Sequence, residues 1–455
     1  MKIKLMLSAA LLATLIGPAV LARQAQPQPQ LRPQAATRPA PRPAPASLPG
    51  AALLPGTQAL LDGYVRDGKM PGAVGAFGVG PLPTLFVQSG RLGDEATAAA
   101  AGPDSLWRVY SMTKPITGLA AMLLVEDGKL KLDQPISDFI PAFRNMRVLT
   151  GPDSLASRPA ARPITVRHLV THTAGLGYNI ITKGPLLKEY ERLGILPGQV
   201  SATVETQARQ VRPRSLQEFA TRVASLPLIA DPGTKWSYSI GLDVMGAVIE
   251  KASGMSFETF LQRRLFTPLN MRSSYWTVPQ SEVGRFATNY VFAGDKRVPV
   301  DPAATSAWLQ DPSFPYGGAG LVMSARDYDR FLHMLQEGGT LDGVRVANPE
   351  TIRTMMSDLL PAGVKFGGIG GMTGGTEGMA MMGFGAGGSV YLADAPGGFS
   401  KGTYGWGGAA GTIAFVDPAR RVRGTVMVNY MPADRYPLRT ELARALASDA
   451  ARFMR

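Results

Sequence analysis

The sequence predicts an α/β fold of the α+β type, in which helices flank an antiparallel β-sheet and an all-helical region is inserted into the chain. Two observations predict this class. Segments rich in Val, Phe and Gly and bounded by turn residues, which are typical of strands, occur near the start of the chain and again near its end. The stretch between them has mainly helical periodicity. We therefore expect one sheet that is built from both terminal parts of the chain.

The predicted strands lie in two groups. Residues 73–93 predict two antiparallel strands, with turn signals at Pro81 and Pro83. In the second group, the strand patterns are found at 389–392, 411–416 and 423–430. The Asp-Pro-Ala-Arg sequence at 417–420 is a good hairpin turn between the last two of these strands.

The predicted helices begin with an apolar pattern at 116–125, which ends at Asp127 and Gly128. Helical patterns recur later in the chain, at 215–223, 242–252, 256–265, 326–337, 349–358 and 439–455. Residues 361–388 are rich in Gly and Met. Because methionine adapts to irregular apolar shapes, this segment is expected to form either a wall of a substrate pocket or an ordinary surface loop.

The first 50 residues are expected to precede the folded domain. Lys2 and Lys4 are followed by an apolar run and a small-residue site at 20–22, which predicts a secretory signal peptide, with an uncleaved membrane anchor as the alternative. Residues 23–50 are rich in proline and contain no acidic residue, which predicts an extended linker. We therefore expect an exported protein, periplasmic or secreted, with no integral membrane segment in the mature chain.

A chain of 455 residues is long enough to bury a sizeable core. We divide it into a signal peptide (1–22), a linker (23–50) and one domain (51–455). Within the domain, the sheet part is expected at about 51–110 and 300–455 and the helical part at about 111–299.

The composition excludes several classes of function. The formal net charge is +13, but no basic block is interleaved with aromatic residues, so nucleic-acid binding is not expected. The chain contains no cysteine, which excludes thiolate nucleophiles and disulfides. There are only three histidines, and no cluster has the spacing of metal ligands. We therefore predict neither a metal nor another cofactor.

The most informative motif is the single Ser-x-x-Lys of the chain, formed by Ser111 and Lys114 at the start of a predicted helix. A serine hydroxyl is a poor nucleophile until a base takes its proton. Three residues are about one helical turn, so the two side chains project from one face. A lysine that burial keeps neutral can accept the proton. The alternative is a chance match of the motif.

Two further segments can contribute to the same chemistry. Tyr238 lies at a turn that opens the predicted helix at 242–252, where a phenol near a lysine can shuttle a proton. The alternative is a packed tyrosine with a satisfied hydroxyl. Gly407 and Gly408 let a ligand approach the backbone, whose N–H groups can stabilise an oxyanion, unless they are only a glycine kink in a strand.

Together these segments resemble the serine β-lactamase and penicillin-binding-protein superfamily, and within it the family VIII carboxylesterases, which are related to class C β-lactamases. The resemblance extends over nearly all of residues 56–455. The segments that carry it are 107–114 (WRVYSMTK), 168–176 (HLVTHTAGL), 232–239 (PGTKWSYS), 317–321 (GGAGL) and 324–327 (SARD). The family fold, an antiparallel sheet flanked by helices with a helical subdomain, agrees with the predicted class.

The resemblance implies a role for each of these residues. Ser111 is expected to be the nucleophile, Lys114 its base and Tyr238 the second acid or base. The backbone N–H groups of Ser111 and Ala409 are expected to form the oxyanion hole. The positions expected to bind substrate are Trp406, Gly407, Gly408 and Ile240.

Two positions depart from the class C pattern. The third position of Tyr-x-Asn is Ile240, and the Lys-Thr-Gly motif is replaced by Trp406, Gly407 and Gly408. In class C enzymes the resemblance assigns the lysine to the carboxylate of a β-lactam and the asparagine to its amide side chain. Trp and Ile make the cleft more apolar and uncharged, which suits neutral ester substrates.

Three other features are weaker candidates. A Gly-x-Ser-x-Gly sequence around Ser400 resembles a nucleophile elbow, but a glycine-rich strand rather than a helix follows it, and no histidine comes later in the chain. The glycine-rich segment 383–388 resembles a dinucleotide loop but leads into a strand. His172 lies between Thr171 and Thr173 in a helix-to-loop segment, which favours a structural role.

The sequence therefore predicts a serine hydrolase that cleaves carboxylic esters of small molecules through an acyl-enzyme on Ser111. One alternative is a β-lactamase or D-Ala-D-Ala carboxypeptidase, against which the two altered motifs argue. Further alternatives are a transacylase and a non-hydrolytic envelope binding protein of the same fold. The expected partner is a small-molecule ester, and the sequence does not specify an oligomeric state.

Overall fold

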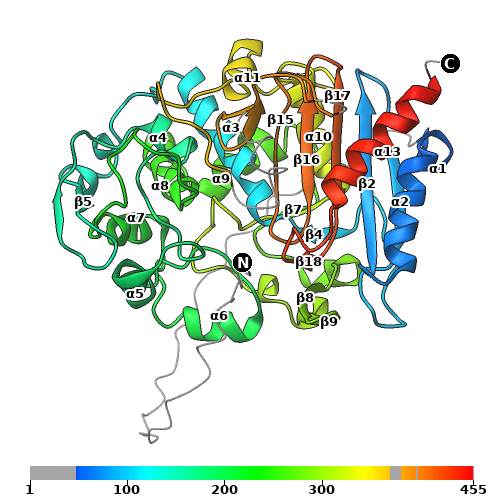
Figure 1. The fold of residues 1–455 in the computed structure, drawn as a ribbon, viewed down its shortest axis with the longest axis horizontal. Coiled ribbons are helices and arrows are strands. Elements are labelled where there is room, and N and C mark those ends of the chain that lie inside the picture. The colour runs from blue at the N-terminus through cyan, green and yellow to red at the C-terminus, as the bar shows by residue number, and fades with distance from the viewer. Residues whose placement is uncertain (1–47, 369–380, 396–397, 454–455) are drawn as a thin grey trace, which may run out of the picture. The chain divides into compact units, whose positions relative to one another are not determined.

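An eight-stranded sheet forms the centre of the described chain, and its strands come from both ends of the sequence (Figure 1). The structure is a computed structural model that describes residues 48–368, 381–395 and 398–453. The predicted signal peptide (1–22) and nearly all of the predicted linker (23–50) lie outside these residues.

The strands of the sheet are β1 (Leu48–Pro49), β2 (Gly72–Val79), β3 (Leu85–Gly90), β13 (Met382–Phe384), β14 (Ser389–Tyr391), β15 (Tyr404–Gly407), β16 (Ile413–Asp417) and β17 (Val422–Met427). Their order across the sheet is β1-β3-β2-β17-β16-β15-β14-β13. All neighbours are antiparallel except β1, which runs parallel to β3. The pairing of β2 with β17 confirms the prediction of one sheet built from both ends of the chain, and β1 shows that the last residues of the predicted linker belong to it.

Helices cover both faces of this sheet (Figure 1). On one face, α2 (Pro55–Arg66) packs against α13 (Leu438–Phe453), and the carboxylate of Asp449 accepts hydrogen bonds from the first turn of α2. On the other face, α10 (Ala325–Gln336) packs against β2 and β17. Successive side chains of β2 alternate between two buried clusters, because neighbouring residues of a strand point to opposite faces.

A helical region lies beside the sheet and occupies the middle of the sequence (Figure 1). Its helices are α4 (Val166–Val170), α5 (Gly184–Arg192), α6 (Ala202–Ala208), α7 (Leu216–Ala224), α8 (Gly241–Ser253) and α9 (Phe257–Leu261). Its centre is α8, which packs against α3 (Thr113–Glu126), α4, α7 and α9. The first nine residues of α8 are all buried, so this helix is part of the core rather than an amphipathic surface helix.

The predicted helices all occur, but the sequence pattern does not predict several short elements. The helix expected at 256–265 is α-helical only over α9 and continues as a π-helical turn at Gln262–Phe266. Two further α-helices of the described residues are α11 (Pro349–Met355), which was predicted at 349–358, and α1 (Gly50–Leu53), which was not predicted. In the part of the chain that the structure describes, short strands also form four small sheets. They are β4 (Leu106–Arg108) with β10 (Val322–Ser324) and β7 (Ser274–Tyr275); β8 (Asn289–Ala293) with β9 (Lys296–Asp301) and β18 (Tyr430–Met431); β5 (Arg147–Leu149) with β6 (Ser157–Pro159); and β11 (Thr340–Leu341) with β12 (Val344–Arg345). None of the described helices has both the length and the apolarity needed to cross a membrane.

A buried ion pair ties β4 to the end of β9. The guanidinium of Arg108 donates from Nε to the Oδ2 atom of Asp301 at 2.8 Å, and both side chains are almost completely buried. The same guanidinium lies 4.1 Å from the ring centre of Phe286, and the Oδ1 atom of Asp301 accepts the backbone N–H of Ala307. Because β4 ends three residues before Ser111, this pair fixes the position of the chain as it enters the candidate site.

We expect Asp301→Asn to lower the free energy of unfolding by about 3–5 kcal/mol, because it leaves the Arg108 guanidinium buried without a counter-charge. The matched control is Glu350→Gln, which breaks the solvent-exposed ion pair with Arg353 and should change the free energy by less than about 1 kcal/mol. Denaturant unfolding followed by tryptophan fluorescence measures both variants. Equally small effects in the two variants would contradict the role given to the buried pair.

Candidate active site

Ser111 lies between β4 and α3, in a single turn of 3-10 helix at Tyr110–Met112. The α-helix therefore begins two residues after Ser111 rather than at Ser111. Tyr110 has a φ of 42°, a backbone conformation that is uncommon for a residue other than glycine. Its ring packs edge-on against Trp308, and its hydroxyl accepts a hydrogen bond from Asn289 at 3.0 Å. These contacts hold the sharp turn that presents the Ser111 side chain.

Two predicted side chains reach the Ser111 hydroxyl. The phenol of Tyr238 donates to Ser111 Oγ at 2.6 Å, and the Nζ atom of Lys114 lies 3.3 Å from the same oxygen. Lys114 has no exposed surface, whereas Ser111 keeps 8% of its surface exposed. Nζ also lies 4.5 Å from the centre of the Tyr238 ring. The structure thus brings Ser111, Lys114 and Tyr238 into direct contact, although Tyr238 comes from a loop more than one hundred residues later.

We call Ser111, Lys114 and Tyr238 the trio. A glycine-rich segment at 317–321, which we call the glycine strap, forms hydrogen bonds beside it. The Gly318 carbonyl accepts a hydrogen bond from Lys114 Nζ at 2.7 Å, and the Gly317 carbonyl accepts one from Thr117 at 2.6 Å. The N–H of Leu321 donates to the Thr113 hydroxyl at 3.1 Å. The strap is therefore fastened along the first turns of α3 and gives the buried lysine a fixed acceptor.

The strap is also held from α8. The Gly318 N–H donates to the Oδ1 atom of Asp243 at 2.8 Å, and Asp243 is completely buried. Burial raises the pKa of Asp243 to about 6, although the nearby Lys114 acts in the opposite direction. Neither Gly318 nor Asp243 was among the predicted site residues, because each acts through its contact with another residue. The only sequence signal for the pair is the glycine-rich segment itself.

Five aromatic side chains form a wall beside the trio, which we call the aromatic wall. Its members, all at least nine-tenths buried, are Trp236, Tyr238, Phe366, Phe384 and Trp406. The centre of the Tyr238 ring lies 6.3 Å from that of Trp236 and 5.9 Å from that of Trp406. Since these side chains are aromatic and none is a carboxylate, an amine or a guanidinium, the wall fits the apolar cleft that was expected from the altered motifs. Phe366 comes from the Gly- and Met-rich segment at 361–388, of which residues 369–380 lie outside the described residues.

The third motif forms the end of β15 and the turn after it. Gly408 fits closely against the backbone before Ser111, since a Cβ atom there would lie 2.5 Å from the Val109 carbonyl oxygen. The N–H of Gly411 donates to the Gly408 carbonyl at 3.0 Å, which closes a turn that contains the half-buried Ala409. Glycine at position 408 therefore brings the Ala409 turn next to the turn of Ser111.

Ile240, another predicted substrate-binding residue, lies in the core directly before α8. Its side chain has no exposed surface and belongs to the main core, and its N–H donates to the Gly177 carbonyl at 3.1 Å. It precedes α8 directly and so fixes where that helix begins. A direct contact of Ile240 with substrate stays a prediction.

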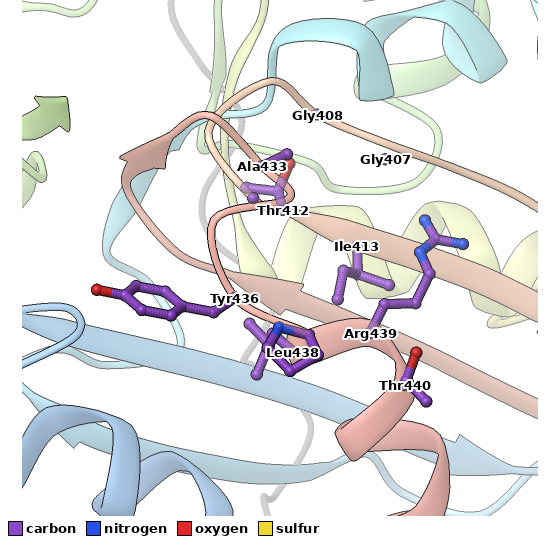
Figure 2. A pocket seen from close by; sticks show the side chains of 11 residues that line it. Gly407, Gly408, Thr412, Ile413, Ala433, Tyr436, Leu438, Arg439 and Thr440 are labelled. Carbon is purple, nitrogen blue, oxygen red and sulfur yellow. The ribbon is translucent and has the colours of Figure 1, made fainter. Parts of the chain in front are cut away.

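Gly407 and Gly408 also line a pocket on the side of the sheet covered by α13 (Figure 2). Thr412 and the segment around Arg439, at the start of α13, form other parts of its wall. None of the three trio residues lines this pocket, so it is separate from the contacts around the Ser111 hydroxyl.

His172 supports the loop that carries Tyr238. Its Nδ1 atom lies 3.0 Å from the Ser239 hydroxyl and accepts the Ser239 N–H at 3.2 Å, while its carbonyl accepts the N–H of Ser237 at 2.9 Å. Its φ of 59° places it in a left-handed turn. Burial lowers the pKa of His172 well below its usual value, and Lys114 adds to this effect when it is protonated, so the ring is neutral. These contacts agree with the structural role predicted for it.

The weaker candidates lie elsewhere in the fold. Ser400 is buried in the loop before β15, where its N–H donates to the Asp417 carboxylate at 3.1 Å. The segment at 383–388 forms the tight connection between β13 and β14. Within the described part of the chain, no group of three or more His, Asp or Glu residues is arranged to hold a metal ion.

Comparisons with known proteins agree with this geometry. The family model named beta-lactamase matches residues 57–448. The chain belongs to the beta-lactamase family. Esterase EstB from Burkholderia gladioli is 31% identical over 388 residues, which cover 82% of this chain and 89% of the esterase. Acyltransferase calJ from Penicillium decumbens is 28% identical over 82% of this chain and 90% of its own length.

A solved structure extends the comparison to the fold. A mutant of simvastatin synthase from Aspergillus terreus superimposes with a TM-score of 0.71 at 25% identity, and the match covers 89% of this chain and 98% of the synthase. The predicted fold class and the predicted family are therefore confirmed. The family consists of serine hydrolases and acyltransferases on one fold, and its members include esterases.

Proposed function

We propose that the protein is a carboxylesterase that cleaves neutral esters through an acyl-enzyme on Ser111. The observation that carries this proposal is the convergence of Lys114 and Tyr238 on one hydroxyl, at 3.3 and 2.6 Å. A serine needs a nearby base to become a nucleophile, and a leaving alkoxide needs a nearby acid. Two different titratable groups on one serine oxygen can supply both functions.

In the proposed acylation, neutral Lys114 accepts the proton of the Ser111 hydroxyl while Oγ forms a bond to the ester carbonyl carbon. The carbonyl electron pair moves onto the carbonyl oxygen. When this intermediate collapses, the bond to the alcohol oxygen breaks, and Tyr238 donates its proton to that oxygen. Tyr238 then regains a proton from the Lys114 ammonium. Water repeats the same sequence on the acyl-enzyme, which releases the acid and restores Ser111.

The oxyanion is assigned to the backbone N–H groups of Ser111 and Ala409. What supports this assignment is the close approach of the two turns, since Gly408 leaves no room for a Cβ atom against Val109. Backbone donors that are already fixed in place stabilise the developing negative charge without reorganisation, an effect worth about 3–4 kcal/mol for one donor.

The aromatic wall supports an uncharged substrate. An anionic group beside Trp406 and Tyr238 would lose its hydration and gain no counter-charge from these side chains. A neutral ester has no charged group that would be left there without a counter-charge. Similarity to EstB supports ester cleavage as the first activity to test. Similarity to calJ supports a second candidate, a transacylase in which an alcohol replaces water in the second half-reaction. A product analysis with added alcohols separates the two.

We expect Ser111→Ala to abolish hydrolysis of p-nitrophenyl butyrate and to leave the thermal unfolding midpoint nearly unchanged, because it removes only one hydroxyl oxygen at the site. Ser400→Ala is the matched control and should keep activity, since Ser400 lies outside the trio. Steady-state assays and thermal unfolding measure both. Loss of activity only in Ser400→Ala would show that the wrong serine has been chosen.

Lys114→Ala and Tyr238→Phe are each expected to lower kcat by at least ~10²-fold, the scale for removing a positioned proton-transfer group. Both side chains contact the same oxygen, so the double variant should lose much less than the product of the two single effects. Rates of the three variants on one ester measure this coupling. Fully multiplicative losses would contradict a shared proton path.

Trp406→Lys is expected to shift the ratio of kcat/KM values toward β-lactams, because it places a cation where the aromatic wall has none. Trp406→Met is the matched control, since it opens similar space without adding a charge. Assays with p-nitrophenyl butyrate and nitrocefin measure the ratio, and the wild type should favour the ester. Preference of the wild type for nitrocefin would favour the β-lactamase alternative instead.

A further inference from the structure

One buried carboxylate near the trio has no part in the proposed acylation steps. Asp243 lies in the first turn of α8 and has no exposed surface. Its Oδ1 atom accepts the Gly318 N–H at 2.8 Å, while its Oδ2 atom has no hydrogen-bond partner among the described residues. A buried carboxylate oxygen without a hydrogen-bond partner destabilises the fold, so stability alone does not explain an aspartate at this position.

Asp243 is connected to Lys114 through a single residue of the strap. Gly318 donates its N–H to Asp243 and accepts a hydrogen bond from Lys114 Nζ with its carbonyl. The fit is tight, because a Cβ atom at position 318 would lie 2.6 Å from the Oδ2 atom of Asp243. A shift of the carboxylate therefore moves Gly318, and with it the acceptor that holds the lysine 3.3 Å from Ser111 Oγ.

The charges around Asp243 make the connection electrostatic as well as steric. The titratable groups that share this buried region are Lys114 on α3, the phenols of Tyr178 and Tyr238, and the neutral ring of His172. Asp243 and Lys114 act on each other, and the carboxylate also raises the pKa of Tyr178 further than burial alone. Among these groups, Asp243 is the one that can carry a negative charge at neutral pH.

We propose that Asp243 is a positioning residue that fixes Lys114 through the strap and supplies the counter-charge when Lys114 takes the Ser111 proton. The inference rests on the proposed function. During acylation a proton moves from Ser111 Oγ to Lys114 Nζ, so an ammonium forms in a region without exposed surface. A carboxylate already present at a fixed position stabilises that ammonium without reorganisation of solvent.

The sign of the effect on pH dependence follows from the charge. The carboxylate favours the ammonium form, so removing its charge makes Lys114 easier to deprotonate in the free enzyme. Asp243→Asn keeps an oxygen that can accept the Gly318 N–H and removes only the charge. The acidic limb of the pH–rate profile should then move to lower pH, while the rate on the plateau falls. If Asp243 had only a structural role, Asp243→Asn would lower the plateau rate but would not change the pH of the acidic limb.

The experiment measures the rate at which a fluorophosphonate labels Ser111, followed by intact mass, at a series of pH values. We expect Asp243→Asn to lower the plateau rate at least ~10-fold and to move the acidic limb down by about one pH unit. The matched control is Asp327→Asn. Asp327 is also buried, burial raises its pKa to about 6, and it bonds the Ser273 N–H and the Ser274 hydroxyl away from the trio. Asp327→Asn should change neither the plateau rate nor the pH of the acidic limb.

Each outcome decides one of the two proposals. If the wild type is not labelled at Ser111, the proposed function fails. If the wild type is labelled and the acidic limb of Asp243→Asn lies at the same pH as that of the wild type, the proposed function is supported and the proposed role of Asp243 is overturned. Should Asp243→Asn fail to fold, Asp243→Ser takes its place, since it also removes the charge and keeps a hydroxyl acceptor. The same limb shift is expected from it, and an unmoved limb again overturns the inference.

Discussion

The complete burial of Lys114 is the constraint on which the rest of the site depends. An amine without exposed surface needs fixed partners, and it has two acceptors, the Gly318 carbonyl and the Ser111 hydroxyl. Neighbouring backbone segments also pack closely against Lys114. A Cβ atom at Gly387 would lie 2.3 Å from the Lys114 carbonyl oxygen. The helix that carries the lysine is therefore locked between the strap and the β13–β14 connection.

This constraint explains why the site is assembled from distant parts of the chain. The sheet supplies the turn after β15, the helical region supplies α8 and the Tyr238 loop, and α3 lies between them. Asp243, which reaches Lys114 through Gly318, supplies a carboxylate beside the ammonium that forms during the proposed reaction.

The features that could be predicted from the sequence are those that have a local sequence pattern. The spacing of Ser111 and Lys114, the hairpin between β16 and β17, and the helices all have short-range patterns that the structure contains. The segment of the strap and an apolar cleft could be predicted from motifs, but the contacts of the strap and of the aromatic wall could not, because they join segments that no local pattern relates. The left-handed Tyr110 and the buried Asp243 could not be predicted for the same reason, since only tertiary packing holds them there.

The central claim is that hydrolysis passes through a covalent acyl group on Ser111. The most direct measurement mixes the protein with p-nitrophenyl butyrate, quenches with acid during turnover, and locates any adduct by peptide mass spectrometry. We expect one butyryl group on the peptide that contains Ser111, and the loss of that group by hydrolysis once the ester is used up. An adduct on another residue, or continued turnover with no adduct on Ser111 at any quench time, would contradict it.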